Sequence, residues 1–395
     1  MVRSAAMTQT FLACTELEAD LSWLQTALAP MGQVLRTSQS LDELFGLIDA
    51  TGATLVFVGV DRENLSAQCA LIESLLEARP LLAVMVLGDG FDNDLVIASM
   101  RAGARDFVTQ GLRGSEVLGL VRRITERLPA LPARKQQGNL TLLFGNQPDA
   151  DAGLIAAHMA LTMQKSGQRT LLVDLGVPVG ESLDVLALEP SFVFSDAVRN
   201  LRRIDRSLID SAFVEHDSGL RVLPSGGTDG QISLYSSSEL FLLTAALRQN
   251  FDQVLVNLTG QPDSEVLRNF LGQANQLCWY VDPSVSCCRR NLDLLLKWRN
   301  DGVKLDHARL LIDRHFSNVA PDAKALGRTF EMPVLAALPA SAELRLKARN
   351  QRINLFQLAP RDPLTRSLGE LVAQLTPEAN APAPSLVQRL VGLVK

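Results

Sequence analysis

Residues 140–180 constrain the fold of this chain more than any other segment. An apolar run at 140–144 is followed by a loop, by a helical pattern over about 151–165, and by a second apolar run at 170–173 that ends in Asp174. A strand, a crossover helix and a second strand form a βαβ unit with two parallel strands. The segment therefore predicts an α/β domain that holds its ligand in the loop after the first strand.

That loop lacks the groups that bind a polyphosphate. Such a loop needs glycine N–H groups around the anion, a lysine for the β- and γ-phosphates and a serine or threonine for Mg²⁺. Here Pro148 has no N–H, and Asp149 and Asp151 place negative charge where phosphate would lie. The first lysine of the segment is Lys165, at the far end of the helix. The pattern predicts the backbone architecture of a phosphate-binding domain without the groups that bind phosphate and Mg²⁺.

From residue 139 onward the chain resembles the MinD/ParA group of deviant Walker ATPases, and specifically the TadZ/CpaE family associated with Flp (Tad, type IVc) pilus assembly. The loop of that group has the form KGGxGxTT and precedes a helix with an AxNLA pattern, with which residues 156–160 (AAHMA) are aligned. On this alignment the active positions hold other residues: Gln147 at the signature lysine, Pro148 and Asp149 at the paired glycines, Asp151 at the third glycine, Ala152 at the second basic position, and Gly153 and Leu154 at the hydroxyl positions.

Three further positions depart from what the resemblance implies. Asp174 keeps only the first carboxylate of a DxD motif, Asn257 stands at the aspartate that directs water or metal, and Asp313 replaces the asparagine of an Asn-Arg pair near the adenine. We therefore expect a pseudo-ATPase with no catalytic residues, metal or cofactor and with a vestigial nucleotide pocket at Gly145, Gln147, Ala152, Gly153, Asp174, Asn257 and Asp313. The alternative is an active, unconventional ATPase switch that binds ATP and Mg²⁺, with Lys165 or a partner's arginine replacing the lysine.

The first 125 or so residues alternate five short apolar strands with five amphipathic helical patterns. The strands are expected at 10–14, 33–36, 54–58, 81–87 and 106–108, and the helices at about 18–28, 41–49, 65–78, 95–101 and 116–128. This alternation predicts a doubly wound parallel sheet. It resembles the flavodoxin-like receiver domain that the family carries at its N-terminus, and residues 100–108 resemble the receiver stretch before the fifth strand.

The receiver's phosphorylation chemistry is missing from this region. A receiver needs two acidic residues after strand one, an aspartate at the end of strand three and a lysine after strand five. Glu16 stands alone, Gly59 ends the third strand, Asp61 comes two residues late, and Gln110 follows the fifth strand. These four residues mark a vestigial phosphoacceptor region, and we expect a non-phosphorylated pseudo-receiver that serves as an interaction surface.

Four segments follow from these patterns: a receiver-like domain at 1–128, a linker at 129–138 with two prolines, a MinD/ParA-like P-loop NTPase-fold α/β domain at 139–375, and a Pro/Ala tether with a short helix at 376–395. Residues 196–210 and 215–225 resemble TadZ/CpaE more than generic ParA or MinD.

Two surfaces are candidates for partner contact. If residues 196–210 formed one helix, Arg199, Arg202, Arg203 and Arg206 would share a face that either docks on an acidic partner or anionic lipid or is merely solvated. The second is the C-terminal segment 385–395, a short basic amphipathic helix whose apolar face includes Leu386, Leu390 and Leu393. It either meets a membrane surface or folds onto protein.

Composition places the protein among soluble globular chains, with 47% hydrophobic and 21% charged residues. The net charge of -5 disfavours nucleic-acid binding and a DNA-partitioning role. The five cysteines and His158, His307 and His315 lack metal-ligand spacing, and no signal peptide is visible.

The resemblance implies a cytoplasmic scaffold, polar and peripheral to the inner membrane, that forms a homodimer and positions other Flp pilus assembly components through protein contacts.

Overall fold

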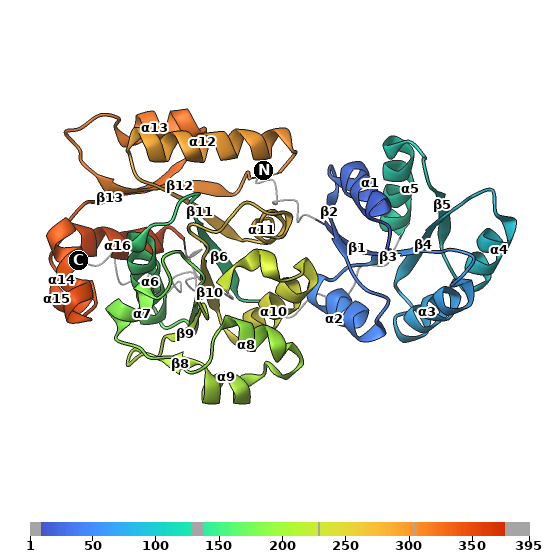
Figure 1. The fold of residues 1–395 in the computed structure, drawn as a ribbon, viewed down its shortest axis with the longest axis horizontal. Helices are drawn as coiled ribbons and strands as arrows, with labels where there is room; N and C mark the ends of the chain where they lie inside the picture. The colour runs from blue at the N-terminus through green and yellow to red at the C-terminus, as the bar shows by residue number, and fades with distance from the viewer. Residues whose placement is uncertain (1–8, 128–136, 228–229, 304, 376–395) are drawn as a thin grey trace, which may run out of the picture.

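The computed structural model describes residues 9–127, 137–227, 230–303 and 305–375. Two α/β bodies lie side by side (Figure 1), which we call the N-terminal domain, residues 9–127, and the second domain, residues 137–375. The predicted linker falls mostly outside the described residues. The predicted C-terminal helix, with Leu386, Leu390 and Leu393, lies wholly outside them.

The N-terminal domain contains a five-stranded parallel sheet in the order β2-β1-β3-β4-β5. Its strands are β1 (Gln9–Cys14), β2 (Gly32–Arg36), β3 (Leu55–Gly59), β4 (Ala83–Gly88) and β5 (Asp106–Thr109), and its helices are α1 (Glu18–Leu28), α2 (Leu41–Thr51), α3 (Leu65–Ala78), α4 (Asn93–Arg101) and α5 (Gly114–Arg127). Alternate residues of the strands are buried against α1 and α5 on one face of the sheet and against α2, α3 and α4 on the other face. This doubly wound arrangement confirms the predicted fold.

The second domain contains an eight-stranded sheet in the order β13-β12-β11-β6-β10-β7-β9-β8, in which only β8 runs antiparallel to its neighbour. The strands are β6 (Asn139–Phe144), β7 (Thr170–Asp174), β8 (Val214–Glu215), β9 (Arg221–Pro224), β10 (Gln253–Asn257), β11 (Gln276–Val281), β12 (Ala308–His315) and β13 (Val334–Pro339). The central strands are buried and mostly apolar because helices cover both faces, and Asp174 and Asn257 are polar residues at strand ends.

Two groups of helices cover this sheet. One face carries α6 (Ala150–Lys165), α7 (Glu181–Leu186), α14 (Ala342–Gln351), α15 (Leu355–Leu358) and α16 (Pro363–Ala373). The other carries α8 (Phe194–Arg199), α9 (Arg206–Ala212), α10 (Ser237–Asn250), α11 (Glu265–Leu271), α12 (Val285–Asn300) and α13 (Ala323–Phe330). The carboxyl ends of β6, β7, β10, β11 and β12 consequently converge at one edge, where an α/β fold holds its ligands.

Residues 196–210 do not form the single helix on which a shared arginine face would depend. Helix α8 ends at Arg199, a 3₁₀ turn spans Leu201–Arg203, and α9 begins at Arg206. Asn200 Nδ2 donates to Asp196 O, and the Asp205 side chain accepts from Leu208 N, so local polar side chains stop one helix and cap the next. Arg199, Arg202, Arg203 and Arg206 therefore do not share one helical face, and their role in partner contact remains a prediction without that geometry.

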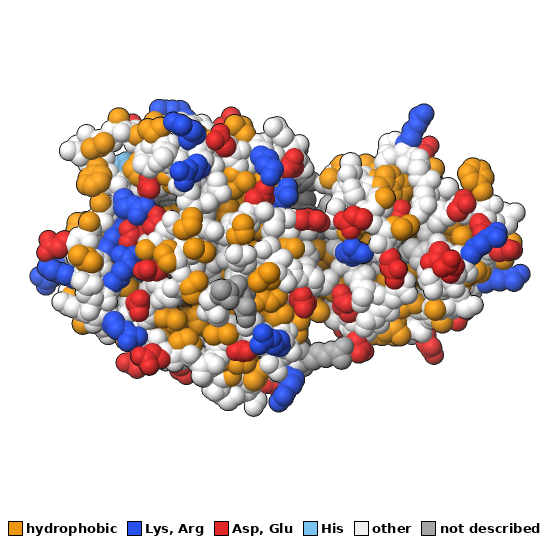
Figure 2. All heavy atoms as spheres, in the orientation of Figure 1, with side chains coloured by type: hydrophobic (Ala, Val, Ile, Leu, Met, Phe, Trp, Pro, Cys, Tyr) orange, Lys and Arg blue, Asp and Glu red, His pale blue; other side chains and the backbone are white. Residues whose placement is uncertain are grey.

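Charged side chains are mixed across the face shown in Figure 2, where Lys and Arg lie among Asp and Glu on both domains. Within the part of the chain that the structure describes, no helix combines the length and apolar character needed to cross a bilayer.

Candidate functional site: a nucleotide-type pocket occupied by ion pairs

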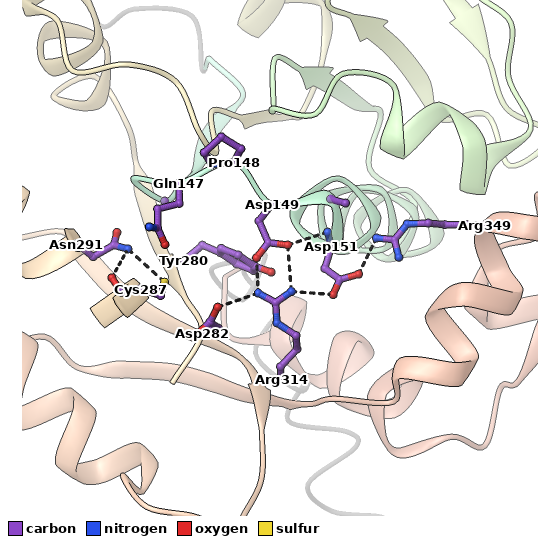
Figure 3. A pocket seen from close by; sticks show the side chains of 12 residues that line it. Gln147, Pro148, Asp149, Asp151, Tyr280, Asp282, Cys287, Asn291, Arg314 and Arg349 are labelled. Carbon is purple, nitrogen blue, oxygen red and sulfur yellow. Dashed lines mark hydrogen bonds and ion pairs between the residues drawn. The ribbon is translucent and has the colours of Figure 1, made fainter. Parts of the chain in front are cut away.

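An open pocket of about 480 Å³ lies at the edge where the parallel strands end. Figure 3 shows side chains that enter it from the β6–α6 loop, the ends of β11 and β12, the start of α12, and α14. Its lining residues are Gly145, Gln147, Pro148, Asp149, Ala150, Asp151, Tyr280, Asp282, Cys287, Asn291, Arg314 and Arg349. The position is the one that the βαβ unit predicts for a bound phosphate.

Three backbone N–H groups in and next to the β6–α6 loop already have partners within the protein. Asn146 N donates to Asn291 Oδ1 at 3.1 Å, and Asp149 N donates to Val177 O at 2.8 Å. Asp151 N donates to the Asp149 carboxylate at 2.9 Å. A phosphate loop works because consecutive N–H groups point at the anion, so this loop offers few of the donors that such a loop requires.

Asp149 occupies the place of an anion at the amino end of α6. Its carboxylate caps the helix through Asp151 N, and it forms a two-point ion pair with Arg314, with Arg314 Nη1 3.2 Å from Asp149 Oδ1. Asp282 also lies within 3.1 Å of Arg314. Burial would lower the pKa of Arg314, but the hydrogen bond to Asp149 raises it above the ordinary value, so the arginine stays charged. Figure 3 shows Arg314 pointing into this group of carboxylates.

Asp151 contacts three arginines from β12 and α14. Its oxygens lie 3.1 Å from Arg314 Nη1, 2.9 Å from Arg345 Nη1 and 2.6 Å from Arg349 Nη2. Burial would raise the pKa of Asp151, but Arg345 and Arg349 hold it below the ordinary value. Arg349 also pairs with Glu181 at 2.8 Å. Carboxylates of the protein thus take the arginines that could otherwise contact an anionic ligand.

Asp313 is buried beneath the pocket, and its charge is paired there. Arg345 Nη1 and Nη2 donate to its two oxygens at 2.7 and 2.6 Å, and the Tyr280 hydroxyl donates at 2.7 Å. The aspartate that departs from the family's asparagine is therefore part of an internal ion pair.

Asp174 and Asn257 are hydrogen-bonded to each other at the ends of adjacent strands. Asn257 Nδ2 donates to Asp174 Oδ1 at 2.8 Å, and Ser182 Oγ donates to the other oxygen. Burial raises the pKa of Asp174 despite these donors. An aspartate at 257 would bring two carboxylates together, whereas the amide supplies a donor.

Two positions of the aligned phosphate-loop motif, Gln147 in the loop and Gly153 in α6, differ in surroundings from those of an active site. A Cβ on Gly153 would lie 2.6 Å from Glu181 Cβ on α7, so a serine or threonine does not fit there without movement. Gln147 faces Arg290: in the amide orientation that pairs donor with acceptor, its oxygen lies 3.1 Å from Arg290 Nε. The residue at the lysine position therefore meets a positive charge from α12.

Of the seven residues predicted for the vestigial pocket, only Gly145 and Gln147 line it. Ala152, Gly153, Asp174, Asn257 and Asp313 are buried around it. Sequence reasoning missed Asp282, Arg345 and Arg349, which complete the ion-pair network. The only sequence signal for the last two was their spacing of four residues on one helical face.

The vestigial phosphoacceptor region brings together only two of its four predicted residues. Asp61 and Gln110 line a second pocket of about 450 Å³, whereas Glu16 and Gly59 do not. Gln110 Nε2 donates to Asp20 at 3.1 Å, and a Cβ on Gly59 would lie 3.1 Å from Thr15 Oγ1. Gln68 and Asn64 hold the Asp61 carboxylate and lower its pKa.

The cysteines are unpaired, and burial raises the pKa of the Cys14 and Cys278 thiols to about 12. The described parts of the chain contain no group of three or more His, Cys, Asp and Glu side chains arranged to hold a metal ion.

Comparison with known proteins finds similar proteins for each of the two domains. The family model described as pilus assembly protein TadZ N-terminal matches residues 7–137. A CheY-like TadZ structure from Pseudomonas aeruginosa PAO1 is 50% identical, covers 32% of this chain and 100% of its own, and superposes with a TM-score of 0.30. Because the identity extends over the whole of that structure, the sequence, and not the superposition, carries the assignment. None of the curated proteins compared with the chain matches it.

The second domain has the fold of ParA and MinD proteins. A ParA family ATPase from Chlorobium tepidum TLS is 17% identical, with 60% of this chain and 99% of that one covered and a TM-score of 0.54. The MinC:MinD cell division complex of Aquifex aeolicus is 14% identical, with 60% of this chain and 96% of that one covered and a TM-score of 0.50. Identities this low show the fold alone. Together with the N-terminal match, they confirm the predicted fold class, and the chain belongs to the TadZ/CpaE family of pilus assembly proteins.

Proposed function

We propose that this protein is a nucleotide-independent scaffold for pilus assembly, a pseudo-ATPase that acts through protein contacts. The observation that carries the proposal is the two-point ion pair between Asp149 and Arg314 at the amino end of α6. A carboxylate of the chain occupies the position of a phosphate and pairs with the nearest arginine. Entry of ATP would bring a polyanion against Asp149, Asp151 and Asp282 unless the network were broken.

The alternative of an active ATPase needs a cation in place of the signature lysine, and Lys165, one of its two candidates, lies too far from the loop. Lys165 is the last residue of α6, a helix of 16 residues. At 1.5 Å per residue, it lies about 22 Å along the axis from the loop, beyond the reach of its side chain. An arginine from another subunit is the remaining candidate in that scheme.

Titration with Mg-ATP tests the proposal. A ligand that binds only the folded state at 100 times its Kd stabilises that state by about 2.7 kcal/mol, so a thermal melt and calorimetry report binding independently. We expect neither heat nor a melting shift up to millimolar Mg-ATP, with a ParA family ATPase as the positive control. Micromolar binding would overturn the pseudo-ATPase proposal and favour the switch.

We also propose that the partners are other pilus assembly components and a second copy of the chain. The expected contacts do not depend on nucleotide, because carboxylates of the protein already pair with Arg314, Arg345 and Arg349 at the site. Light scattering with and without Mg-ATP should give the same mass. A mass that doubles only with nucleotide would favour a switch.

A further inference from the structure

Helix α10 of the second domain packs against α2 of the N-terminal domain (Figure 1). Phe241 on α10 is only 8% exposed, and it belongs to the same hydrophobic cluster as Leu44 and Leu47 of α2. Leu242 packs against the edge of that cluster. A side chain of the second domain is thus part of the core of the first.

Gly46 permits the close approach of these helices. A Cβ at this position would lie 3.0 Å from Leu242 Cδ2. Glycine in a helix interior lowers helix stability, so its presence in α2 fits a requirement for close packing. A Cβ at 46 would require Leu242 to shift, and a long charged side chain there would push α2 away from α10.

Polar contacts extend the interface to β2 and α1. Ser238, 5% exposed, donates from Oγ to Arg36 O at 2.6 Å. On α1, Gln25 Nε2 donates to Glu265 Oε1 of α11 at 3.0 Å. Three elements of the N-terminal domain therefore contact the second domain.

The other end of α10 holds the chain where the second domain begins. Arg248 Nε donates to Gly138 O at 2.7 Å, and Gly138 N donates back to Arg248 O at 2.8 Å. A Cβ on Gly138 would lie 1.9 Å from Phe251 O. Helix α10 therefore anchors both the N-terminal domain and the entry to β6, and it leads into β10, which ends at Asn257.

We propose that α10 is the docking element that fixes the N-terminal domain, so that the chain acts as one rigid unit. Partners then bind a surface that both domains form, while the face of α2 that packs against α10 is buried within the chain. This inference does not depend on whether the pocket binds nucleotide. It follows from the shared core at Phe241 and from the polar contacts at Ser238 and Gln25.

A pair of glycine substitutions in the full chain tests the proposal. Gly46→Glu places a charged side chain against Leu242, whereas Gly119→Glu in α5 has open space around its Cβ. Both changes give a similar gain in helix propensity, so Gly119→Glu is a matched control. In hydrogen exchange, we expect amides of α2 and of the first half of α10 to exchange about tenfold faster in Gly46→Glu only. Calorimetry should show one unfolding transition in the parent and control but two in Gly46→Glu.

A second variant separates loss of docking from loss of folding. Leu242→Glu leaves the N-terminal domain's sequence intact, and its side chain is only partly buried. We expect the same loss of protection in α2 and the same split transition. Parent-like exchange in α2 and a single transition in both Gly46→Glu and Leu242→Glu would overturn the proposal.

Discussion

The guanidinium of Arg345 lies 2.7 and 2.6 Å from the two carboxylate oxygens of Asp313, and neither side chain is more than 2% exposed. Arg345 also reaches Asp151 at 2.9 Å, so one buried arginine links the floor of the pocket to the amino end of α6. Its position on α14 connects three segments that are far apart in the sequence. The pocket is therefore held together by charges that belong to the protein.

Arg345→Met should strongly destabilise the fold. The substitution leaves Asp313 buried with only the Tyr280 hydroxyl as a donor. Removing one partner of a buried ion pair costs about 3–5 kcal/mol because the other charge remains without compensation. Urea denaturation of the full chain measures the loss.

Lys347→Met on the same helix is the control for that experiment. Lys347 pairs with Glu343 at 2.7 Å, but both side chains are exposed. Exposed pairs contribute little, so its unfolding free energy should match the parent's. The double variant Arg345→Met with Asp313→Asn should recover much of the loss, since it removes the stranded charge. Equal effects of Arg345→Met and Lys347→Met would contradict a structural role for the buried pair.

Asp174→Asn should leave the fold and partner binding intact. The carboxylate accepts from Asn257 and Ser182, and an amide can keep a hydrogen bond to each. Because burial raises the folded-state pKa of Asp174, the unfolded chain ionises first as pH rises. The parent should therefore lose stability relative to Asp174→Asn as pH increases from the unfolded pKa through the raised folded value.

Unfolding free energies of the two proteins between pH 4 and 8 check the sign of this difference. Loss of partner binding in Asp174→Asn without loss of stability would instead indicate that the charge is used, as in an active switch.

The regular elements could be predicted because their apolar spacing is strong. The expected bounds of α1 and α3 coincide with those observed, and each expected strand overlaps an observed one. The short helices α7, α8 and α9 were not predicted as separate helices, since each has only six or seven residues and is too brief to show a period. The break between α8 and α9 within residues 196–210 was not visible for the same reason.

The pocket itself was only half predictable. The missing lysine and the acidic residues of the loop were visible in the motif, and they pointed to lost phosphate chemistry. Which cations would meet Asp149 and Asp151 was not visible, because Arg314 is 165 residues from Asp149 and Arg349 is 198 residues from Asp151. Pairs that only the tertiary fold brings together leave no local pattern in one sequence.

The N-terminal domain should not accept phosphate. Gly59 provides no carboxylate, Gln110 provides no cation, and Asp61 is already held by Gln68 at 2.8 Å. Incubation with Mg²⁺ and acetyl phosphate should leave the mass of the intact protein unchanged, with an active receiver as the positive control. Gly59→Asp should remain unmodified as well, because its Cβ would lie 3.1 Å from Thr15 Oγ1 and Gln110 is still uncharged. A mass gain of one phosphoryl group at Asp61 would contradict the pseudo-receiver prediction.

His158 should make the second domain sensitive to acid. It is fully buried on α6, with Nδ1 2.7 Å from Leu154 O and Nε2 accepting from Leu355 N at 2.7 Å, so the neutral ring satisfies both contacts. Burial lowers its pKa to about 4. In the unfolded chain the histidine binds a proton near pH 6.5, whereas in the folded chain it stays neutral down to about pH 4. The contribution of His158 to the free energy of unfolding is therefore fully present above pH 6.5, and about 3 kcal/mol of stability is lost as pH falls toward 4. His158→Gln does not titrate, and its unfolding free energy should fall less than the parent's between pH 7 and 4.5. Parallel pH profiles of the two proteins would show that His158 does not set this acid sensitivity.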